Sequence, residues 1–406
     1  MPVLSALRVR RSRVTALAAL LALHALVIKL AEVVATAGFV GSLGTRELPV
    51  LWIADTVLAL VAGVVCARFI DRMPRSALAA RLFVAFGVGY GMCALLLVAP
   101  LHRAPVYAAL YVLSAQQVAL VPLVVWTLAM DTYADRDTAR LFPVIAAGET
   151  VGQLVGYGFS AAIGASAGAS VRIDVALLAL AVALCAGAAA LCAVRFAPVP
   201  GAAPTETDDA PGEVLATARE HRVLRPLSAT VLLGWVAMSW LAFHVIASLD
   251  AAAEHHDARF RVLYAIYNLG SVVLILAVQS LVSGSFLARF GRRGLQVYPA
   301  TLAFSAALLA GVPGAVAAVA CACGVYVAYY AADIPARHAV LAQVPSAQRG
   351  RATTLVDNYA YAVGSVLGAL LLLVARWVPA SVAAGVAGLA ALAAWEAARR
   401  VRDTAR

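Results

Sequence analysis

Long apolar runs cover most of the chain, and short loops rich in arginine and glycine separate them. Many runs approach the ~20 residues that a helix needs to cross a hydrocarbon core about 30 Å thick. The sequence lacks the segments of about ten alternating apolar and polar residues that are typical of a membrane barrel. The pattern therefore predicts an all-α polytopic membrane protein.

Twelve spans are predicted, in two sets of six. The first set covers residues 14–40, 48–68, 77–100, 104–130, 141–166 and 173–195, and the second covers 223–249, 261–287, 295–312, 314–337, 352–375 and 379–398. Residues 198–222, between the sets, are the one sustained polar stretch, with proline, glycine, threonine and acids. We expect a solvated cytoplasmic linker there, between an N-terminal half (1–197) and a C-terminal half (223–406).

A repeated pattern supports the two halves. Residues 123–160 contain an apolar run, a charged loop and a second apolar run with a glycine ladder, and residues 345–373 contain a weaker copy. Aligning Gly152 with Gly364 also aligns Gly156 with Gly368, a shift of 212 residues. We expect the glycines to let helices approach closely. The charged loop of the first copy is a candidate cytoplasmic motif, formed by Asp131, Asp135, Arg136 and Arg140.

Composition supports a lipid environment and excludes several functions. The chain is 63% hydrophobic and 13% charged, with a mean hydropathy of +0.90, whereas soluble domains carry about 25% charge. Its net charge of +10 lies in loops rather than on one basic face, which argues against a nucleic-acid partner. The six cysteines fall inside apolar runs and are interpreted as buried side chains, and no metal or cofactor is expected. The sequence contains no phosphate-binding loop, zinc-protease motif or nucleophile elbow, so we expect neither an enzyme nor an ATP-driven pump.

The distribution of arginine predicts the orientation. With both termini on one side, that side has 24 arginines, and the opposite side has six: Arg46, Arg103, Arg172, Arg259, Arg261 and Arg376. Because cytoplasmic loops are enriched in arginine and lysine, both termini and the linker are predicted to be cytoplasmic, in a bacterial-type inner membrane. The basic N-terminus is followed by an apolar run too long for a signal peptide, which we interpret as an uncleaved first span.

Basic turns follow spans 2 and 8, at residues 68–75 and 289–294. Turns at these two equivalent places resemble the Gly/Asp/Arg-rich loops of the major facilitator superfamily. The resemblance implies the major facilitator fold, with twelve helices in two pseudo-symmetric six-helix halves. It also implies a substrate site between the halves near the bilayer midplane and access that alternates by rocking.

Lys29 and Glu32 are the first intramembrane candidates. A charge at the centre of the bilayer costs about 2.5–3.5 kcal/mol on insertion scales, so each needs a partner or a function. At an i, i+3 spacing the two side chains can pair on one helical face. They could be a self-neutralised structural pair, or Lys29, the sole lysine of the chain, could attract an anionic substrate that Glu32 helps to release.

Three carboxylates come next. Asp55, Glu149 and Asp357 lie on spans 2, 5 and 11, which line the seam between the halves if the major facilitator resemblance holds. A buried carboxyl group there could carry a coupling proton, because burial favours its neutral form. Each could instead pair with an arginine as a gate or cap a kink.

Span 10 carries Asp333 and Arg337 on either side of Pro335. Proline frees a backbone carbonyl and kinks the helix. The planar guanidinium of Arg337 suits a phosphate or a carboxylate, and the alternative is a salt bridge at the cytoplasmic end. Gln116 and Asn268 are candidate substrate contacts by hydrogen bonding, although most such groups join helices to one another.

Residues 126–156 carry a narrower resemblance, to the nucleotide-translocase-like (ATP/ADP carrier protein) family. The matching residues are Trp126, Leu128, Asp131, Asp135, Arg136, Ala139, Arg140, Leu141, Phe142 and Gly148, with Pro335, Ala336, Arg337, Pro345, Arg349, Gly350, Asp357 and Gly364 in the second half. The resemblance covers about a third of the chain and implies twelve spans and the exchange or uptake of nucleotides. Where the family has Gly-Gly-Ser, this chain has Gly148, Glu149 and Thr150.

These observations predict a secondary transporter that works by alternating access on a small, anionic organic solute such as a nucleotide. One alternative is proton-coupled transport of another small solute, such as a drug, a lipid or a metabolite. The other is a non-transporting membrane scaffold or receptor.

Overall fold

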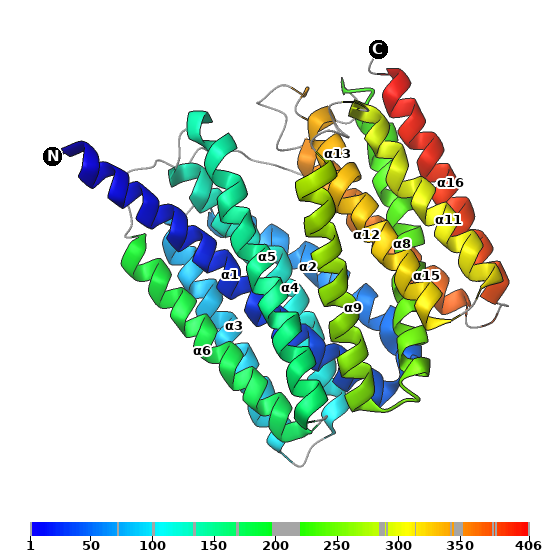
Figure 1. The fold of residues 1–406 in the computed structure, drawn as a ribbon, viewed down its shortest axis with the longest axis horizontal. Helices are drawn as coiled ribbons and strands as arrows, with labels where there is room; N and C mark the ends of the chain where they lie inside the picture. Colours follow the sequence, from blue (N-terminus) through cyan, green and yellow to red (C-terminus); the bar gives the residue numbers. More distant parts are fainter. Residues whose placement is uncertain are drawn as a thin grey trace. The chain divides into compact units, whose positions relative to one another are not determined.

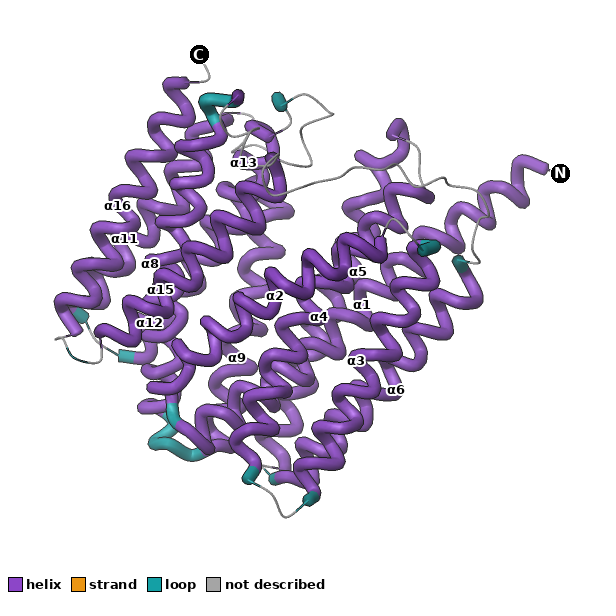
Figure 2. Tube along the Cα trace, turned by 180° about the vertical axis from the view of Figure 1, so that it is seen from behind, coloured by secondary structure: helices purple, strands orange, loops and turns teal. Residues whose placement is uncertain are grey.

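The structure is a computed structural model of the 406-residue chain. It describes residues 2–70, 73–99, 102–132, 135–167, 170–196, 220–283, 289, 291–312, 314–341, 343–344, 352–375, 377 and 380–404. Every regular element in these residues is helical (Figure 2). The predicted all-α polytopic fold is therefore confirmed.

The helices of the first half follow the predicted spans closely. They are α1 (Pro2–Leu43), the 3₁₀ turn η1 (Thr45–Glu47), α2 (Leu48–Ile70), α3 (Arg75–Val98), α4 (Arg103–Thr132), α5 (Asp135–Ala167) and α6 (Val171–Arg195). The predicted cytoplasmic motif lies where α4 ends and α5 begins, and its side chains are outside the described part of the chain, as is most of the predicted linker.

The second half repeats this series with more interruptions. Its helices are α8 (Leu224–Ala252), α9 (Asp257–Val278), α11 (Val297–Gly311), α12 (Ala315–Ala328), α13 (Ile334–Leu341), α15 (Tyr361–Ala375) and α16 (Ala380–Thr404). A 3₁₀ segment, η3 (Gly291–Gln296), leads into α11. Three π-helical segments extend or join the others: η2 (Gln279–Ser283), η4 (Tyr329–Asp333) and η5 (Thr354–Ala360).

Ten helical stretches in the described residues are long and apolar enough to cross a membrane. Two predicted spans, α2 and α5, are helices at the expected places but are not among these ten. The chain is thus an integral membrane protein by the length and composition of its helices.

The chain divides into two compact units. Unit 1 comprises residues 1–44, 61–206 and 255–272, and unit 2 comprises 45–60, 207–254 and 273–406. A short segment at the start of α2 therefore belongs to unit 2, and the corresponding start of α9 belongs to unit 1. The two units thus exchange short segments at the starts of α2 and α9. These segments lie away from residues 198–222, so the predicted division between the halves there stays a prediction.

Helix packing repeats from one unit to the other (Figure 1). In unit 1, α1 packs against α4, α5 and α6, and α3 packs against α4 and α6. In unit 2, α8 packs against α12, α15 and α16, and α11 packs against α12 and α16. Each pairing of the first series has its counterpart in the second, so the repeat seen in the sequence is also a repeat of contacts.

The glycine ladders lie where these pairings are tightest. A Cβ atom built on Gly152 would collide with the backbone of Ala22, and one on Gly364 would collide with the carbonyl of Leu232. One turn later, Gly156 faces Lys29, and Gly368 faces Ser239. The prediction that these glycines allow close helix approach is confirmed.

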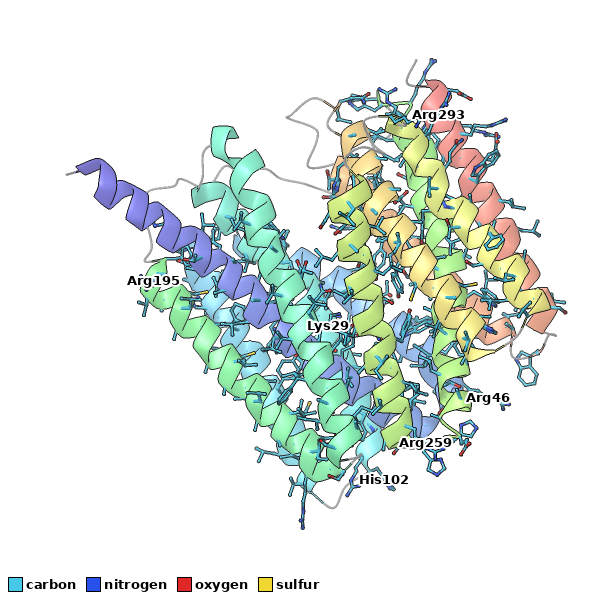
Figure 3. All side chains as sticks on the ribbon, in the orientation of Figure 1. Lys29, Arg46, His102, Arg195, Arg259 and Arg293 are labelled. Atoms are coloured by element: carbon cyan, nitrogen blue, oxygen red, sulfur yellow. The ribbon has the colours of Figure 1, made fainter. Side chains whose placement is uncertain are left out.

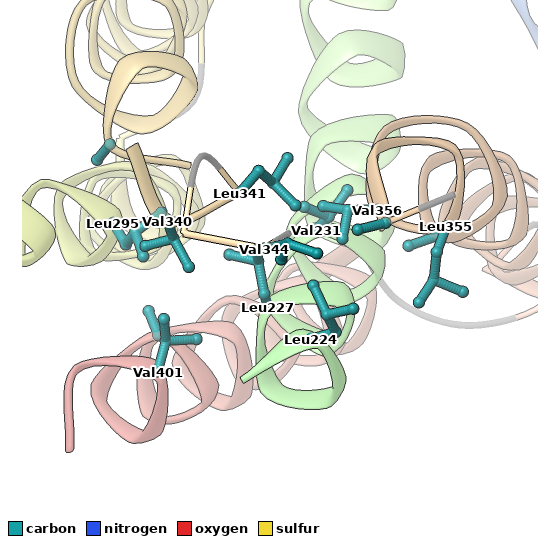
Figure 4. Close-up of a cluster of buried hydrophobic side chains, with 14 residues drawn as sticks. Leu224, Leu227, Val231, Leu295, Val340, Leu341, Val344, Leu355, Val356 and Val401 are labelled. Atoms are coloured by element: carbon teal, nitrogen blue, oxygen red, sulfur yellow. The ribbon is translucent and has the colours of Figure 1, made fainter. Parts of the chain in front are cut away.

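A separate apolar core closes one end of unit 2. Its fourteen residues come from α8, η3, α13, η5 and α16 and the residues next to them, and ten are labelled in Figure 4: Leu224, Leu227, Val231, Leu295, Val340, Leu341, Val344, Leu355, Val356 and Val401. Six of these ten are fully buried. This core fixes the positions of α13, which carries Arg337, and η5, which carries Asp357.

Candidate functional site

The predicted pair of Lys29 and Glu32 forms on α1. Lys29 Nζ lies 2.8 Å from Glu32 Oε2, and its ammonium group lies 5.2 Å from the centre of the Tyr157 ring. The other carboxylate oxygen, Glu32 Oε1, accepts hydrogen bonds from Tyr157 (3.2 Å) and Tyr264 (2.9 Å). Each oxygen of Glu32 therefore has its own donors, and three helices of unit 1 contribute to the cluster.

Helix α5 places polar side chains beside α1 at intervals of four residues. Its glycines face α1, and the next residue along each time is polar: Glu149, Gln153 and Tyr157 follow Gly148, Gly152 and Gly156. Residues four apart lie on one helical face, so the three polar groups form a stripe beside the α1 contact. Gln153 Nε2 donates to Glu149 Oε1 over 3.3 Å, and Tyr157 reaches Glu32.

The cluster is partly open and lies away from the ends of unit 1. The Lys29 and Glu32 side chains are 18% and 21% exposed. In Figure 3, Lys29 lies between Arg195, at one end of the unit, and His102 and Arg259, at the other. Charges so far from a helix end are costly to insert into lipid unless they are paired and hydrated. The pairing and the partial exposure of these two side chains meet both conditions.

A second buried network, which the sequence did not indicate, lies in unit 1. Arg261 Nη2 donates to Asp174 Oδ1 over 2.5 Å, and the Tyr107 hydroxyl donates to Asp174 Oδ2 over 2.7 Å. Arg261 and Asp174 are each only 2% exposed. Arg261, the first residue of the predicted span 261–287, is buried in the second turn of α9, which begins at Asp257.

Unit 2 contains a charged triad around Arg337. Its Nη1 lies 2.6 Å from Asp357 Oδ1, and its Nη2 lies 3.1 Å from Asp333 Oδ2. His338 Nε2 lies 3.5 Å from the other oxygen of Asp357. Arg337 and Asp333 are buried, whereas the Asp357 side chain is 25% exposed. One guanidinium is thus shared by two carboxylates, which compensates its charge within the protein.

Aromatic side chains surround this triad. The Arg337 guanidinium lies 5.5 Å from the centre of the Tyr329 ring. Trp235 packs edge-on against Tyr329 and Tyr361, with centroid distances of 5.8 and 4.5 Å. Tyr329 and Asp333 begin and end the π-helix η4, and Asp357 lies in the π-helix η5. Such π-helical turns are frequent at functional sites, because they re-aim side chains and leave carbonyls available.

Asn268, Gln116 and Asp55 complete the predicted candidates. Asn268 on α9 donates its amide to the carbonyl of Tyr264 over 2.8 Å, and Gln116 on α4 is buried. Asp55 on α2 is half-buried and belongs to unit 2. Within the described residues, no three His, Cys, Asp or Glu side chains are grouped as a metal site requires.

Sequence reasoning found the charges around Lys29 and Arg337, but not the ion pair of Asp174 with Arg261 or the tyrosines that bind these carboxylates. Tyr157, Tyr264, Asp174 and Tyr107 were not predicted. The four-residue spacing of Glu149, Gln153 and Tyr157 was a usable signal, since it marks a polar stripe on an apolar helix.

Comparison with known proteins was made by sequence and by structure. No protein-family model matches the sequence, and no curated protein matches it. A solved structure of a POT family transporter in complex with a thioalcohol-conjugated peptide superimposes with a TM-score of 0.67 and 10% identity, covering 95% of both chains.

Two further solved structures resemble the chain over most of its length. A bacterial homologue of the human lysosomal transporter Spinster, in an inward-facing and unoccupied conformation, has a TM-score of 0.64 and 14% identity, covering 98% of this chain and 94% of the other. The nucleoside transporter NupG has a TM-score of 0.61 and 14% identity, covering 95% and 99%. At such identities the likeness concerns the fold, and the fold of this chain is that of the major facilitator-type transporters.

Proposed function

We propose that the protein is a secondary transporter that moves a small organic solute by alternating access. The observation that carries the proposal is the partly exposed Lys29–Glu32 pair far from the helix ends of unit 1. A purely structural protein gains nothing from such charges, because their insertion is unfavourable. Solutes of several classes are transported by the proteins whose folds are similar, so the fold alone does not choose a substrate.

We further propose that Lys29 binds an anionic group of the solute. Glu32 keeps two tyrosine donors, from Tyr157 and Tyr264, on an oxygen that Lys29 does not use. The ammonium group can therefore turn to the solute without leaving Glu32 unpaired, which would be costly in a partly buried site. When the solute leaves, Glu32 attracts Lys29 back and restores the empty state.

Charge limits the solute that fits. Arg337, the other cation proposed to hold an anion, shares its charge with Asp333 and Asp357. A single ammonium group, that of Lys29, suits a solute with one or two negative charges better than a triphosphate. Nucleotides remain candidate solutes because of the resemblance to the ATP/ADP carrier family. Nucleoside monophosphates and carboxylates are therefore tested beside ATP and ADP.

The first experiment identifies the ligand by thermal unfolding of the purified protein with nucleotides, nucleosides and other metabolites. A ligand that binds the folded state alone raises the apparent stability. The solutes found are then tested for uptake into proteoliposomes. Lys29→Ala is expected to abolish binding and uptake while inserting normally. Arg13→Ala removes an exposed charge from the same helix and is expected to transport normally. Normal transport by Lys29→Ala would remove Lys29 from the site.

A second candidate function is proton-coupled transport, and Glu149 favours it. Its side chain is half-buried, and within the described residues it forms a hydrogen bond with Gln153 but no ion pair. A carboxyl group in this setting can bind and release a proton without breaking a salt bridge. Glu149→Gln is expected to abolish uptake driven by a pH gradient and to spare solute exchange. Unchanged pH dependence in this variant would exclude Glu149 as the coupling group.

A further inference from the structure

An open groove lies between two helices of unit 2, away from the charged clusters. It has a volume of about 490 Å³ and is formed by η3, α11 and α16. Arg293 and Gln296 line one part of it, and Phe304 and Trp395 line another. Figure 3 places Arg293 at the end of the unit at which α16 terminates. The groove therefore runs from a helix end toward the apolar middle of the unit.

Polar donors in the groove lack partners. Arg293 is exposed and, in the described part of the chain, faces no carboxylate. The amide nitrogen of Gln296 is buried and has no hydrogen-bond acceptor among the described residues. Thr301 is different, because its hydroxyl already donates to the carbonyl of Val297 over 2.8 Å. A cation and an amide donor are thus available for a negatively charged ligand with acceptor oxygens.

The apolar part of the groove continues into a lipid-like surface. Phe304 is 65% exposed on α11. On α16 a stripe of exposed apolar residues recurs every three or four positions: Val382, Val386, Leu389, Leu392 and Trp395. In a membrane-spanning helix such a face lies against acyl chains, and tryptophan is enriched where the chains meet the headgroups. Polarity therefore changes along the groove as it does along a phospholipid.

We propose that this groove binds one anionic phospholipid, whose phosphate contacts Arg293 and Gln296 and whose acyl chain lies along Phe304 and Trp395. Phe304 lies eight positions after Gln296 along the helix, a rise of about 12 Å. This length takes the ligand from the headgroup region into the hydrocarbon. A soluble phosphate would leave the apolar part of the groove empty, and a zwitterionic lipid would bring a second cation close to Arg293.

The test uses the tryptophan in the groove as its reporter. The full-length protein is placed in phosphatidylcholine nanodiscs with an increasing fraction of brominated phosphatidylglycerol or of brominated phosphatidylcholine. Bromine on an acyl chain quenches tryptophan on contact, so selective binding appears as extra quenching by the anionic lipid at low fractions. This extra quenching is expected to disappear in Trp395→Phe, which keeps an aromatic ring in the groove.

Two arginine variants separate the groove from the general surface charge. Arg293→Gln is expected to raise the lipid fraction for half-maximal extra quenching about fivefold, the contribution of one arginine near an anionic lipid surface. Arg225→Gln removes another exposed arginine from unit 2 that does not line the groove, and it should leave this fraction unchanged. Thermal unfolding in unbrominated nanodiscs verifies that both variants fold.

Several results would overturn the proposal. Equal quenching by the two lipids, or extra quenching that survives in Trp395→Phe, would show that no anionic lipid binds here. An equal shift in both arginine variants would assign the effect to surface charge. Relief of quenching by water-soluble glycerol phosphate would assign the groove to a free phosphate instead of a lipid. Should Arg293→Gln not fold, Gln296→Met carries the same expectation, because it removes the buried amide donor.

Discussion

Replacing Gly152 by alanine tests the close approach of α1 and α5. A Cβ atom at this position would lie 2.9 Å from both the carbonyl carbon of Ala22 and the Cβ of Ala25. The carbonyl oxygen of Ala22 would lie closer still. Carbon atoms pack best at about 3.5–4.0 Å, so the two carbon contacts alone require the helices to separate by about 0.6–1.1 Å. Overpacking of this kind costs about 1–3 kcal/mol. On the same helix, a Cβ atom at Gly158 would meet nothing within 4 Å.

The Gly158→Ala variant is therefore a matched control. Both substitutions gain about 1 kcal/mol of helix propensity, because alanine replaces glycine inside a helix. We expect Gly158→Ala to be as stable as the parent or more so, and Gly152→Ala to be less stable than Gly158→Ala by about 1–3 kcal/mol. Denaturant titration of the purified proteins in detergent measures this difference. Equal stability of the two variants would show that α1 and α5 do not meet at Gly152.

Three further outcomes are expected from the charged clusters. Arg337→Gln leaves buried Asp333 without its cation and should lower the free energy of unfolding by about 3–5 kcal/mol. Adding Asp333→Asn should restore part of this loss, so destabilising effects that simply add in the double variant would contradict the pairing. Asp174→Asn removes the partner of a fully buried guanidinium and should destabilise by a similar amount, about 3–5 kcal/mol in the same titration, so wild-type stability would contradict that ion pair. Tyr264→Phe deletes one hydrogen-bond donor to Glu32 and should raise the KM for the solute more than it lowers kcat. Unchanged KM and kcat would show that Glu32 has no part in binding.

Much of the fold was predictable because hydropathy and helix length are local properties. The predicted span 295–312 corresponds to α11 (Val297–Gly311), and the predicted span 173–195 to α6. Pairs on one helix were also predictable. Lys29 with Glu32, and Arg337 with Asp333, are three and four residues apart, and both pairs form. In each case, the spacing along one helix is enough to specify the contact.

Contacts between distant segments were not predictable in this way. Arg261 is the first residue of the predicted span 261–287, and at the start of an apolar run a hydropathy pattern cannot separate a buried arginine from an exposed one. Its partner, Asp174, lies on another helix. Likewise, nothing in the local sequence connects Tyr264 with Glu32, which is 232 residues away. Arg261 and Tyr264 lie in residues 255–272, the segment of the second half that belongs to unit 1, and this brings them to Asp174 and Glu32. Which unit a segment joins depends on the whole fold and not on its local sequence.

This exchange of segments delays the completion of unit 1 while the chain is being made. Unit 1 lacks residues 255–272 until the ribosome has entered the second half of the chain. Arg261 follows Asp174 by 87 residues, which takes about 4–17 s at the usual 5–20 residues per second. During that interval the carboxyl group of Asp174, whether already in the membrane or not yet inserted, has no guanidinium partner. The membrane-insertion machinery must therefore tolerate an incomplete unit 1 until residues 255–272 are made.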